Sequence, residues 1–407
     1  MKCRSISSRL LPIVAACLSV SASASAATAA APRPNLVLII ADDMNWDDCG
    51  AYGHPAIRTP NIDRLAAEGA RFQHAYLTTN SCSPSRSSIL TGRYPHNTGA
   101  EQLHWPLPAG AKTFAEQLKA LGYYTAAAGK WHLGNAVRSH FDKIYEASEA
   151  GFVLPTGKAG AAGKMVATEP SGCEDWERAL DERAKDKPFF LWLASLDPHR
   201  EYTAGTLQPP HRIEDVIVPP HLPDTPEVRE DLRLYYDEIG RLDRYVGKVM
   251  AKLKSQGVDD NTLVLFITDN GRPFPSDKAT LYDGGIRTPW IVRWPSVIAA
   301  GQTSFALMSA VDIATTFVEL GGGSMATDGK SFASVLRDPR RAHRDFAFAE
   351  DHWHDFEDHA RSASTQQYKL VRNDYIDLPS TPSADAGRGL SWQAMLKLQA
   401  AGKLPPH

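Results

Sequence analysis

Four segments of the chain are short, continuous runs of apolar residues, and turn residues bound each of them. They are "NLVLIIADD" from Asn35, "YYTAAAGKWH" from Tyr123, "KPFFLWLASLDPH" from Lys187 and "NTLVLFITDNG" from Asn261. Runs of this length and composition are typical of strands that are buried on both faces of a parallel sheet. The pattern therefore predicts at least four such strands.

The segments between these runs have the apolar spacing and the end signals of helices. Helices are predicted over 59–69 and 113–122, each with a threonine at its N-cap and a glycine at its end, and over the long amphipathic stretch 226–253. Alternation of strands and helices predicts an α/β fold with a mostly parallel central sheet flanked by helices. In open sheets of this kind, ligands bind beyond the carboxyl ends of the strands.

Length and charge narrow the classes of function. A chain of 407 residues is long enough to bury a large core, as one large domain or as a large and a small one. Its net charge of -3 gives no basic face for nucleic acid. The expected partner is therefore a small or polyanionic molecule that meets the protein at a local site.

The N-terminus has the pattern of an export signal. Lys2, Arg4 and Arg9 precede an apolar core from Leu10 to Val20, and an Ala/Ser run follows. We therefore expect a protein exported to the periplasm or secreted, with residues 1–31 as its signal peptide. The alternative is lipidation of Cys17 in "VAAC", which resembles a lipobox. No later segment of the sequence is a transmembrane candidate.

The four apolar runs end in a narrow choice of polar side chains. These are Asp42 and Asp43, Lys130 and His132, Asp197 and His199, and Asp269 and Asn270. The carboxyl ends of parallel strands meet at one edge of a sheet, so we expect these side chains to share a site.

Four of them form a set of hard oxygen ligands. Asp42, Asp43, Asp269 and Asn270 have no His or Cys neighbours at zinc spacing, and carboxylate and amide oxygens suit Ca²⁺ or Mg²⁺, with Ca²⁺ favoured in an exported protein. Adjacent residues of an extended strand point to opposite faces, so Asp42 and Asp43 can both bind only if the chain turns there.

The cationic residues suit a tetrahedral anion. On an extended chain Lys130 and His132 share one face while Trp131 points away. The ammonium can hold anionic oxygens and the imidazole can transfer a proton, with His199 as a second acid–base candidate.

The remaining feature is Cys82, in "NSCSPSRSSILTG" from Asn80 to Gly92. Pro84 and Gly92 place it at or just before the start of a helix, where an anion is favoured, and Arg86 adds a positive charge one turn further on. A plain thiol there would have a lowered pKa and could be a nucleophile, although a thiolate is an ill-matched ligand for Ca²⁺. With Cys49 and Cys173 it forms no disulfide framework, and at most one pair is expected.

These motifs resemble the sulfatase family of the alkaline-phosphatase-like fold. C-x-P-S-R stands at Cys82–Arg86, followed by "SSILTGRYPHNTG", and "ADD", "GKWHLG", "DPH" and "DNG" occur in the family's order, from about Asn35 to Tyr375. Within the family, "LASLDPHR" and "DNGRPFPSDKATLYDGGIRTPWIVRWP" are most similar to the N-sulfoglucosamine sulfohydrolase (heparan sulfamidase) branch and its bacterial relatives.

The resemblance implies a role for each matching residue. Cys82 would be converted by a formylglycine-generating maturation enzyme to Cα-formylglycine, whose hydrated aldehyde supplies the hydroxyl that attacks sulfur. Asp42, Asp43, Asp269, Asn270 and the converted Cys82 would bind the metal. Arg86 would hold the formylglycine, Lys130 and Lys278 the sulfate oxygens, His132 the formylglycine hydroxyls, and His199 would protonate the leaving group.

Substrate contacts and domain limits are expected from the same resemblance. His104 in "LHWPLPAG", and Glu350, His352 and His354 in "AEDHWHDFEDH", are candidates to line the substrate pocket. The catalytic domain is expected over 32–322. Residues 323–407 would form a small antiparallel sheet with a helix, in a truncated or reduced form because the family's usual closing run is not found.

The expected function is hydrolysis of sulfate esters or N-sulfo groups of sulfated sugars. Two alternatives remain open: a formylglycine-dependent phosphodiesterase or phosphonate monoester hydrolase, and a non-catalytic sulfoglycan-binding protein. A periplasmic binding protein is disfavoured, because it would not need Cys82, Lys130, His132 and His199 together.

Overall fold

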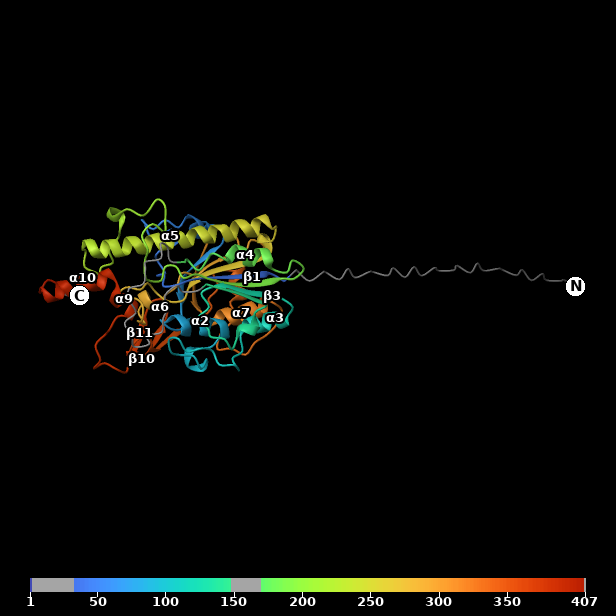
Figure 1. The fold of residues 1–407 in the computed structure, drawn as a ribbon. Coiled ribbons are helices and arrows are strands. Elements are labelled where there is room, and N and C mark those ends of the chain that lie inside the picture. The colour runs from blue at the N-terminus through green and yellow to red at the C-terminus, as the bar shows by residue number, and fades with distance from the viewer. Residues whose placement is uncertain (2–32, 148–169, 406–407) are drawn as a thin grey trace. The chain divides into compact units, whose positions relative to one another are not determined.

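The computed structural model of the protein describes Met1 and residues 33–147 and 170–405. The predicted signal peptide, with Cys17, lies outside the described residues. From Arg33 onward the chain forms one compact unit. The predicted α/β class is confirmed, because an eight-stranded, mostly parallel sheet carries helices on both faces (Figure 1).

The large sheet has its four predicted strands side by side. Its order is β4 (Lys143–Glu146), β3 (Tyr124–Gly129), β5 (Phe189–Ala194), β1 (Asn35–Ala41), β6 (Thr262–Thr268), β7 (Ile291–Arg293), β2 (Ala70–Tyr76) and β8 (Gln302–Ser309). The strands β3, β5, β1 and β6 are all parallel, whereas β7 is antiparallel to both of its neighbours.

Helices connect most of these strands, and further helices follow β8. They are α1 (Pro60–Ala67), α2 (Cys82–Thr91), α3 (Phe114–Ala120), α4 (Trp176–Glu182), α5 (Pro226–Ser255), α6 (Asp283–Ile286), α7 (Asp312–Leu320), α8 (Ala333–Arg337), α9 (Ala384–Arg388) and α10 (Leu390–Ala400). The N-cap expected at Thr113 is confirmed, because its hydroxyl accepts a hydrogen bond from the backbone N–H of Glu116. Thr225 caps α5 in the same way.

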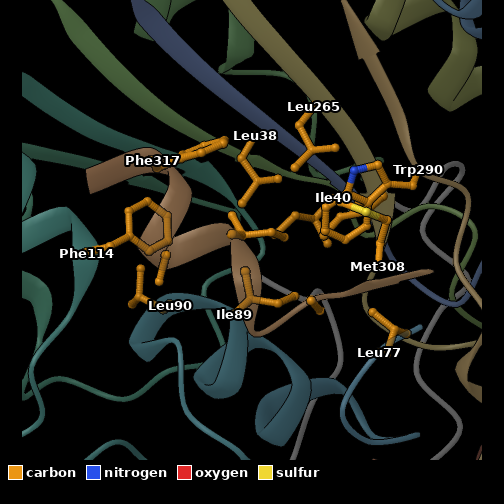
Figure 2. Packing of buried hydrophobic residues seen from close by; sticks show 14 of the residues in the cluster. Leu38, Ile40, Leu77, Ile89, Leu90, Phe114, Leu265, Trp290, Met308 and Phe317 are labelled. Carbon is orange, nitrogen blue, oxygen red and sulfur yellow. The ribbon is translucent and has the colours of Figure 1, made fainter. Parts of the chain in front are cut away.

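The central strand β1 explains why the sheet needs both layers of helices. All its residues are buried, and Leu36, Leu38 and Ile40 pack toward α2, α3 and α7, as Figure 2 shows for part of this core. The alternate residues Val37 and Ile39 pack toward α1, α4 and α5. A strand with both faces covered has a continuous apolar sequence, which is why periodicity alone shows no polar face.

A second, smaller sheet follows in the last part of the chain. It is antiparallel and has the order β11 (Lys369–Asn373), β10 (Glu357–Ser364) and β9 (Ala347–Trp353). The helices α9 and α10 come after it, and α10 packs beside α5. A short antiparallel sheet with a helix was predicted for this region; the boundary near residue 322 stays a prediction.

Candidate active site

The carboxyl ends of β3, β5, β1 and β6 lie next to one another at one edge of the large sheet. The polar residues that follow them come together there, as the strand ends predicted. One of them faces elsewhere: the carboxylate of Asp197 accepts a hydrogen bond of 2.8 Å from Nε of Arg241 on α5. Asp197 is therefore a structural anchor beside the cluster, and its backbone oxygen accepts the N–H of Asp42 at 3.0 Å.

The chain turns at Asp43, as two adjacent ligand residues require. Its φ of +65° is in the left-handed region, so the carboxylates of Asp42 and Asp43 both reach the cluster. Asp42 Oδ2 lies 2.6 Å from Lys130 Nζ, and Asp43 Oδ1 accepts a hydrogen bond of 2.5 Å from Nδ2 of Asn270. Asp42, Asp43, Asp269 and Asn270 are all fully buried.

Arg86 crosses the cluster from the second turn of α2. Its guanidinium is fully buried, and Nε donates a hydrogen bond of 2.8 Å to Oδ2 of Asp269, while Nη2 lies 3.8 Å from Oδ1 of Asp42. A buried guanidinium is tolerated only where carboxylates compensate its charge. The pair therefore joins the start of α2 to the end of β6.

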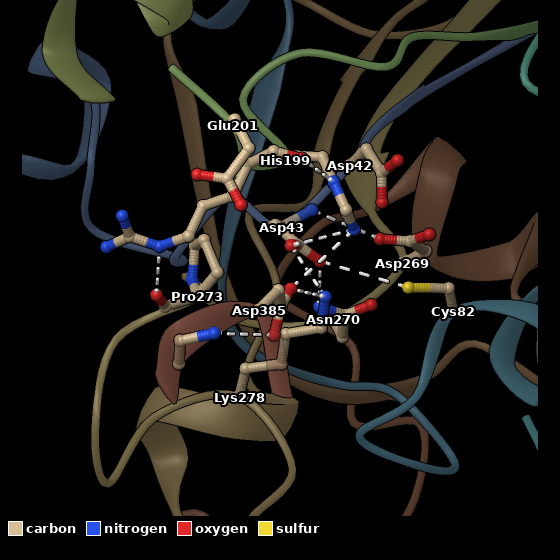
Figure 3. A network of polar contacts seen from close by, with 12 residues as sticks. Asp42, Asp43, Cys82, His199, Glu201, Asp269, Asn270, Pro273, Lys278 and Asp385 are labelled. Atoms are coloured by element: carbon tan, nitrogen blue, oxygen red, sulfur yellow. Dashed lines mark hydrogen bonds and ion pairs between the residues drawn. The ribbon is translucent and has the colours of Figure 1, made fainter. Parts of the chain in front are cut away.

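Cys82 is the first residue of α2 and has a free, buried thiol. Its Sγ points toward Asp43 and lies 3.9 Å from Oδ1 of that residue (Figure 3). Burial raises the pKa of the thiol well above its ordinary value, and outweighs Lys278 and Lys130, which lower it. The prediction of a lowered pKa is therefore wrong, because it counted the helix terminus and the cations but not desolvation. Cys49 and Cys173 are also free, so the three thiols form no disulfide.

The donor set around Cys82 fits a hard cation. Ligand atoms of Asp42, Cys82 and Asp269 lie within 4.8 Å of one another, and so do those of Asp43, Cys82 and His199. Oδ1 of Asp42 and Oδ1 of Asn270 are buried and have no hydrogen-bond partner among the described residues. Buried polar atoms are normally satisfied, so these oxygens fit a ligand that is not part of the chain. Oxygen donors of this type suit Ca²⁺ or Mg²⁺.

His132 reaches the cluster by a different route from the one predicted. The strand β3 ends at Gly129, and His132 has a φ of +51°, so the chain is not extended through Lys130 and His132. Nε2 of His132 lies 2.7 Å from Nδ1 of His104, whose backbone N–H donates a hydrogen bond of 2.7 Å to Oγ of Ser83. Burial, followed by the nearby Lys130 and His104, lowers the pKa of His132 well below its ordinary value, so its ring is neutral.

His199 stands at the rim of the cluster. Its side chain is 29% exposed, and Nε2 lies 3.8 Å from Oδ2 of Asp43 and 3.6 Å from Oδ2 of Asp385. Its Nδ1 contacts the backbone oxygen of Arg200, which fixes the ring. An imidazole that is partly open to solvent and near the cluster is placed to transfer a proton to a bound molecule.

Asp385 is a member of the cluster that sequence reasoning missed. Its Oδ2 lies 2.6 Å from Lys278 Nζ, which in turn lies 2.7 Å from Oδ2 of Asp43. Although burial raises it, Lys278, His199 and His354 hold the pKa of Asp385 well below its usual value. It stands on the short helix α9, after no apolar run, so no local signal in the sequence marks it.

The four candidate substrate residues fall into three environments. His104 is exposed and contacts His132. Glu350 is 3% exposed, its Oε2 lies 2.8 Å from Nδ1 of His96, and Nε2 of His352 lies 3.4 Å from its Oε1. His354 lines a pocket of about 390 Å³. The structure thus brings His104 and His354 to the cluster, whereas Glu350 and His352 form a separate group. Substrate contact stays a prediction for all four.

Two family models match the chain, and their matches overlap. The Sulfatase family model matches residues 34–323, and the model "N-sulphoglucosamine sulphohydrolase, C-terminal" matches residues 274–378.

Two curated relatives and one solved structure illustrate the similarity. The N-sulphoglucosamine sulphohydrolase of Homo sapiens is 30% identical over 411 residues, covering 91% of this chain and 79% of that protein. The N-acetylgalactosamine-6-sulfatase of Rattus norvegicus is 33% identical over 346 residues, covering 71% of this chain but only 62% of its own length. A structure solved with "its substrate D-Glucosamine-2-N, 6-O-disulfate" has a TM-score of 0.70 at 21% identity, covering 92% of this chain and 96% of that one.

The matched residues include the whole cluster except Asp385. The family match spans the four strand ends and the start of α2, and the relative from Homo sapiens extends the match over most of the chain. The chain belongs to the sulfatase family.

Proposed function

We propose that this protein hydrolyses sulfate esters or N-sulfo groups of sulfated sugars, with Cys82 converted to Cα-formylglycine and a divalent cation bound beside it. The observation that carries the proposal is the convergence of three kinds of group at one sheet edge. Cys82 opens α2 within a buried cluster that holds both unpaired carboxyl and amide oxygens and buried cations. The anionic oxygens of a sulfo group need such cations, and a metal needs such oxygens.

The proposal assigns residues to the cation and to the formylglycine. Asp42, Asp43, Asp269 and Asn270, together with residue 82, would hold the cation, with Ca²⁺ favoured over Mg²⁺. Once bound, the cation would withdraw electron density from the sulfo group. The hydrated formylglycine at residue 82 would supply a hydroxyl able to attack sulfur. An oxygen there removes the mismatch between a neutral, buried thiol and hard metal ligands.

The cationic side chains would bind the sulfo group. Lys130 Nζ lies 2.6 Å from Asp42 Oδ2, and Lys278 Nζ lies 2.7 Å from Asp43 Oδ2. Both are nearly fully buried, so their charges act in a site where water screens them little. Oxygens of a sulfo group placed against residue 82 would therefore have two buried ammonium groups near them.

His132 and His199 would each carry out one of the two proton transfers. The neutral ring of His132 suits a base that takes a proton from the hydroxyl of residue 82 and so helps to break down the sulfated intermediate. His199 at the rim suits the donor that protonates the leaving oxygen or nitrogen of the sugar. Arg86, through its pairing with Asp269, would hold residue 82 and balance the negative charge.

Similarity to N-sulphoglucosamine sulphohydrolase supports an amino sugar with an N-sulfo or O-sulfo group as substrate. The C-terminal match to N-sulphoglucosamine sulphohydrolase and the 30% identity to that enzyme favour this substrate class. The other partners would be the maturation enzyme and, in the cell, an export system acting on the N-terminus. Among the described residues, no helix combines the length and the apolar character needed to cross a membrane.

The test is turnover by protein co-expressed with a formylglycine-generating enzyme. Aryl sulfate, aryl phosphodiester and N-sulfoglucosamine are assayed in parallel, with mass spectrometry of the peptide that contains residue 82. We expect formylglycine mass and a preference for the sulfated substrates. Preference for the phosphodiester would overturn the reaction, unmodified thiol in fully active protein would overturn the nucleophile, and binding without turnover would favour a non-catalytic protein.

A further inference from the structure

A pocket of about 390 Å³ opens next to the catalytic cluster. Its walls come from the ends of β9 and β10, within 351–358, and from the segment 373–383 that leads into α9, together with Ala279. Ala279 directly follows Lys278, and His354 in the pocket wall lies within 4.8 Å of Asp385. The pocket is thus separated from Asp43 by the Lys278–Asp385 pair, and it has the size of a small-molecule site.

The cluster pairs its carboxylates with buried Arg86, Lys130 and Lys278, whereas cations are missing from the lining of this pocket. Its lining includes four carboxylates and no lysine or arginine; the carboxylates are Asp351, Asp355, Glu357 and Asp358. None of the four forms an ion pair with any other described part of the chain. Asp351 is buried, with a raised pKa, and accepts a hydrogen bond from Asn80, so the negative charge of the pocket comes mainly from Asp355, Glu357 and Asp358. A second sulfo group would be repelled by this charge, whereas a hydrogen-bond donor would meet acceptors.

Two buried polar side chains in the pocket wall have no hydrogen-bond partner among the described residues. His354 is 7% exposed, and neither of its ring nitrogens makes a hydrogen bond within the described chain. Ser383 is 2% exposed, and its Oγ is equally without a partner there. Buried groups of this kind are costly unless something satisfies them, so both indicate a ligand that hydrogen-bonds in the pocket.

The ligand is better described as a donor group than as a second metal ion. His354, Asp355 and Asp385 come within 4.8 Å of one another, as metal ligands would. However, Asp385 Oδ2 already accepts a hydrogen bond of 2.6 Å from Lys278, and Asp355 Oδ2 accepts one of 2.6 Å from the N–H of Ala384. Hydroxyl or ammonium groups of a sugar can use the remaining acceptor positions of these carboxylates, and the unpaired Ser383 hydroxyl and His354 ring in the same wall suit hydrogen-bonding groups.

We propose that this pocket is a subsite for the unsulfated part of the sugar, which it binds through hydroxyl or ammonium donors, and that it rejects a second sulfo group. The inference rests on the proposed function, because the sulfo group that reacts would lie in the adjoining cluster. The protein would accordingly act on singly sulfated residues, after any other sulfo group on the same sugar has been removed by a separate hydrolysis.

The test measures binding in the full chain with Cys82→Ala, so that no turnover interferes. Calorimetry compares the affinities of N-sulfoglucosamine and D-glucosamine-N,6-disulfate. Both sugars are measured with the Cys82→Ala protein and with the same protein carrying the additional substitutions Glu357→Gln and Asp358→Asn. We expect N-sulfoglucosamine to bind at least about tenfold more tightly than the disulfate. The variant with Glu357→Gln and Asp358→Asn should lose most of this preference. Asp345→Asn removes an exposed carboxylate outside the pocket and should leave the ratio unchanged.

Further measurements identify the donor group and exclude a folding defect as the cause of weaker binding. D-glucosamine and D-glucose separate an ammonium from hydroxyl donors, and His354→Leu should weaken both sugars about tenfold. Melting temperatures show whether each variant is folded. Equal or tighter binding of the disulfate by folded protein, or no effect of the paired substitutions, overturns the subsite. Turnover of aryl sulfate by matured protein tests the catalytic cluster separately, because that substrate has no sugar.

Discussion

Lys278 and Asp385 form a buried ion pair of 2.6 Å although 107 residues separate them in the sequence. The same ammonium lies 2.7 Å from Asp43, so a residue of the short helix α9 fixes a cation of the active site from outside. Figure 3 shows Lys278 between the two carboxylates. The last part of the chain thus belongs to the catalytic cluster as well as to the pocket beside it.

Asp385→Asn tests this link. The substitution keeps the shape but removes the charge, leaving Lys278 with one carboxylate. Loss of one partner of a buried pair costs about 3–5 kcal/mol of unfolding free energy, and we expect kcat/KM on a sulfated substrate to fall roughly 10- to 100-fold. Urea unfolding and steady-state kinetics measure both, with Asp377→Asn as an exposed control in the same segment. Unchanged activity would show that Lys278 acts without Asp385.

Cys82→Ala should abolish turnover and leave the fold intact. The thiol has one polar contact, of 3.9 Å to Asp43 Oδ1, among the described residues, and removal of one buried sulfur should cost about 1 kcal/mol of unfolding free energy. Loss of a nucleophile lowers kcat by roughly a thousandfold or more. Kinetics and thermal melting of matured protein measure these effects. Cys49→Ala, which removes another buried thiol, should melt lower without a comparable loss of kcat.

Divalent cation should stabilise the protein through the aspartate cluster. Saturating Ca²⁺ at a hundred times its Kd adds about 2.7 kcal/mol of unfolding free energy, and chelation should remove it. In Asp269→Asn this cation-induced shift should largely disappear, whereas Asp259→Asn, away from the cluster, should keep it. The shift itself is the readout, since Asp269→Asn also leaves Arg86 less well paired. A full shift in that variant would exclude Asp269 as a ligand.

Asp351 should make stability depend on pH. Burial raises the pKa of this carboxyl from 3.8 to about 7, although Asn80 donates a hydrogen bond of 2.7 Å to it. The folded state therefore holds the proton more tightly than the unfolded state, so its contribution is present below pH 4 and is lost as pH rises toward 7. Between pH 5 and pH 8 we expect a loss of roughly 2 kcal/mol.

The matched variant is Asp351→Asn, which cannot ionise. Its unfolding free energy, measured with urea at pH 5 and pH 8, should fall less over this range than that of the wild type. Asp345→Asn provides the exposed control. A pH dependence identical to that of the wild type would place the pKa of Asp351 in its ordinary range.

Gly129 at the end of β3 should not tolerate a side chain. It has a φ of +99°, and a Cβ there would lie 1.7 Å from the backbone oxygen of Ala194. We expect Gly129→Ala to lower the unfolding free energy by about 3 kcal/mol or more, and to displace Lys130 and His132 so that activity falls as well. Gly257→Ala, at a positive φ with nothing near the new Cβ, should cost only about 1 kcal/mol.

The sequence by itself determined four strands of the large sheet, the helices α1, α2, α3 and α5, and the polar groups at four strand ends. These are local properties: a continuous apolar run marks a strand that is buried on both faces, and a turn signal marks its end. It also placed Cys82 at the start of α2, because Pro84 and Gly92 limit that helix. The ligand pair Asp42 and Asp43 required a turn, and the left-handed backbone at Asp43 provides it.

Only the tertiary structure decided which neighbours these groups have. The order β3–β5–β1–β6, the turn of Asp197 toward Arg241 and the entry of Asp385 from α9 depend on contacts between distant segments. The pKa of Cys82 likewise follows from burial, which no stretch of sequence fixes alone, because desolvation depends on everything that packs around the thiol. The acidic pocket beside His354 has the same origin: its walls are brought together by the folding of segments that carry no common pattern.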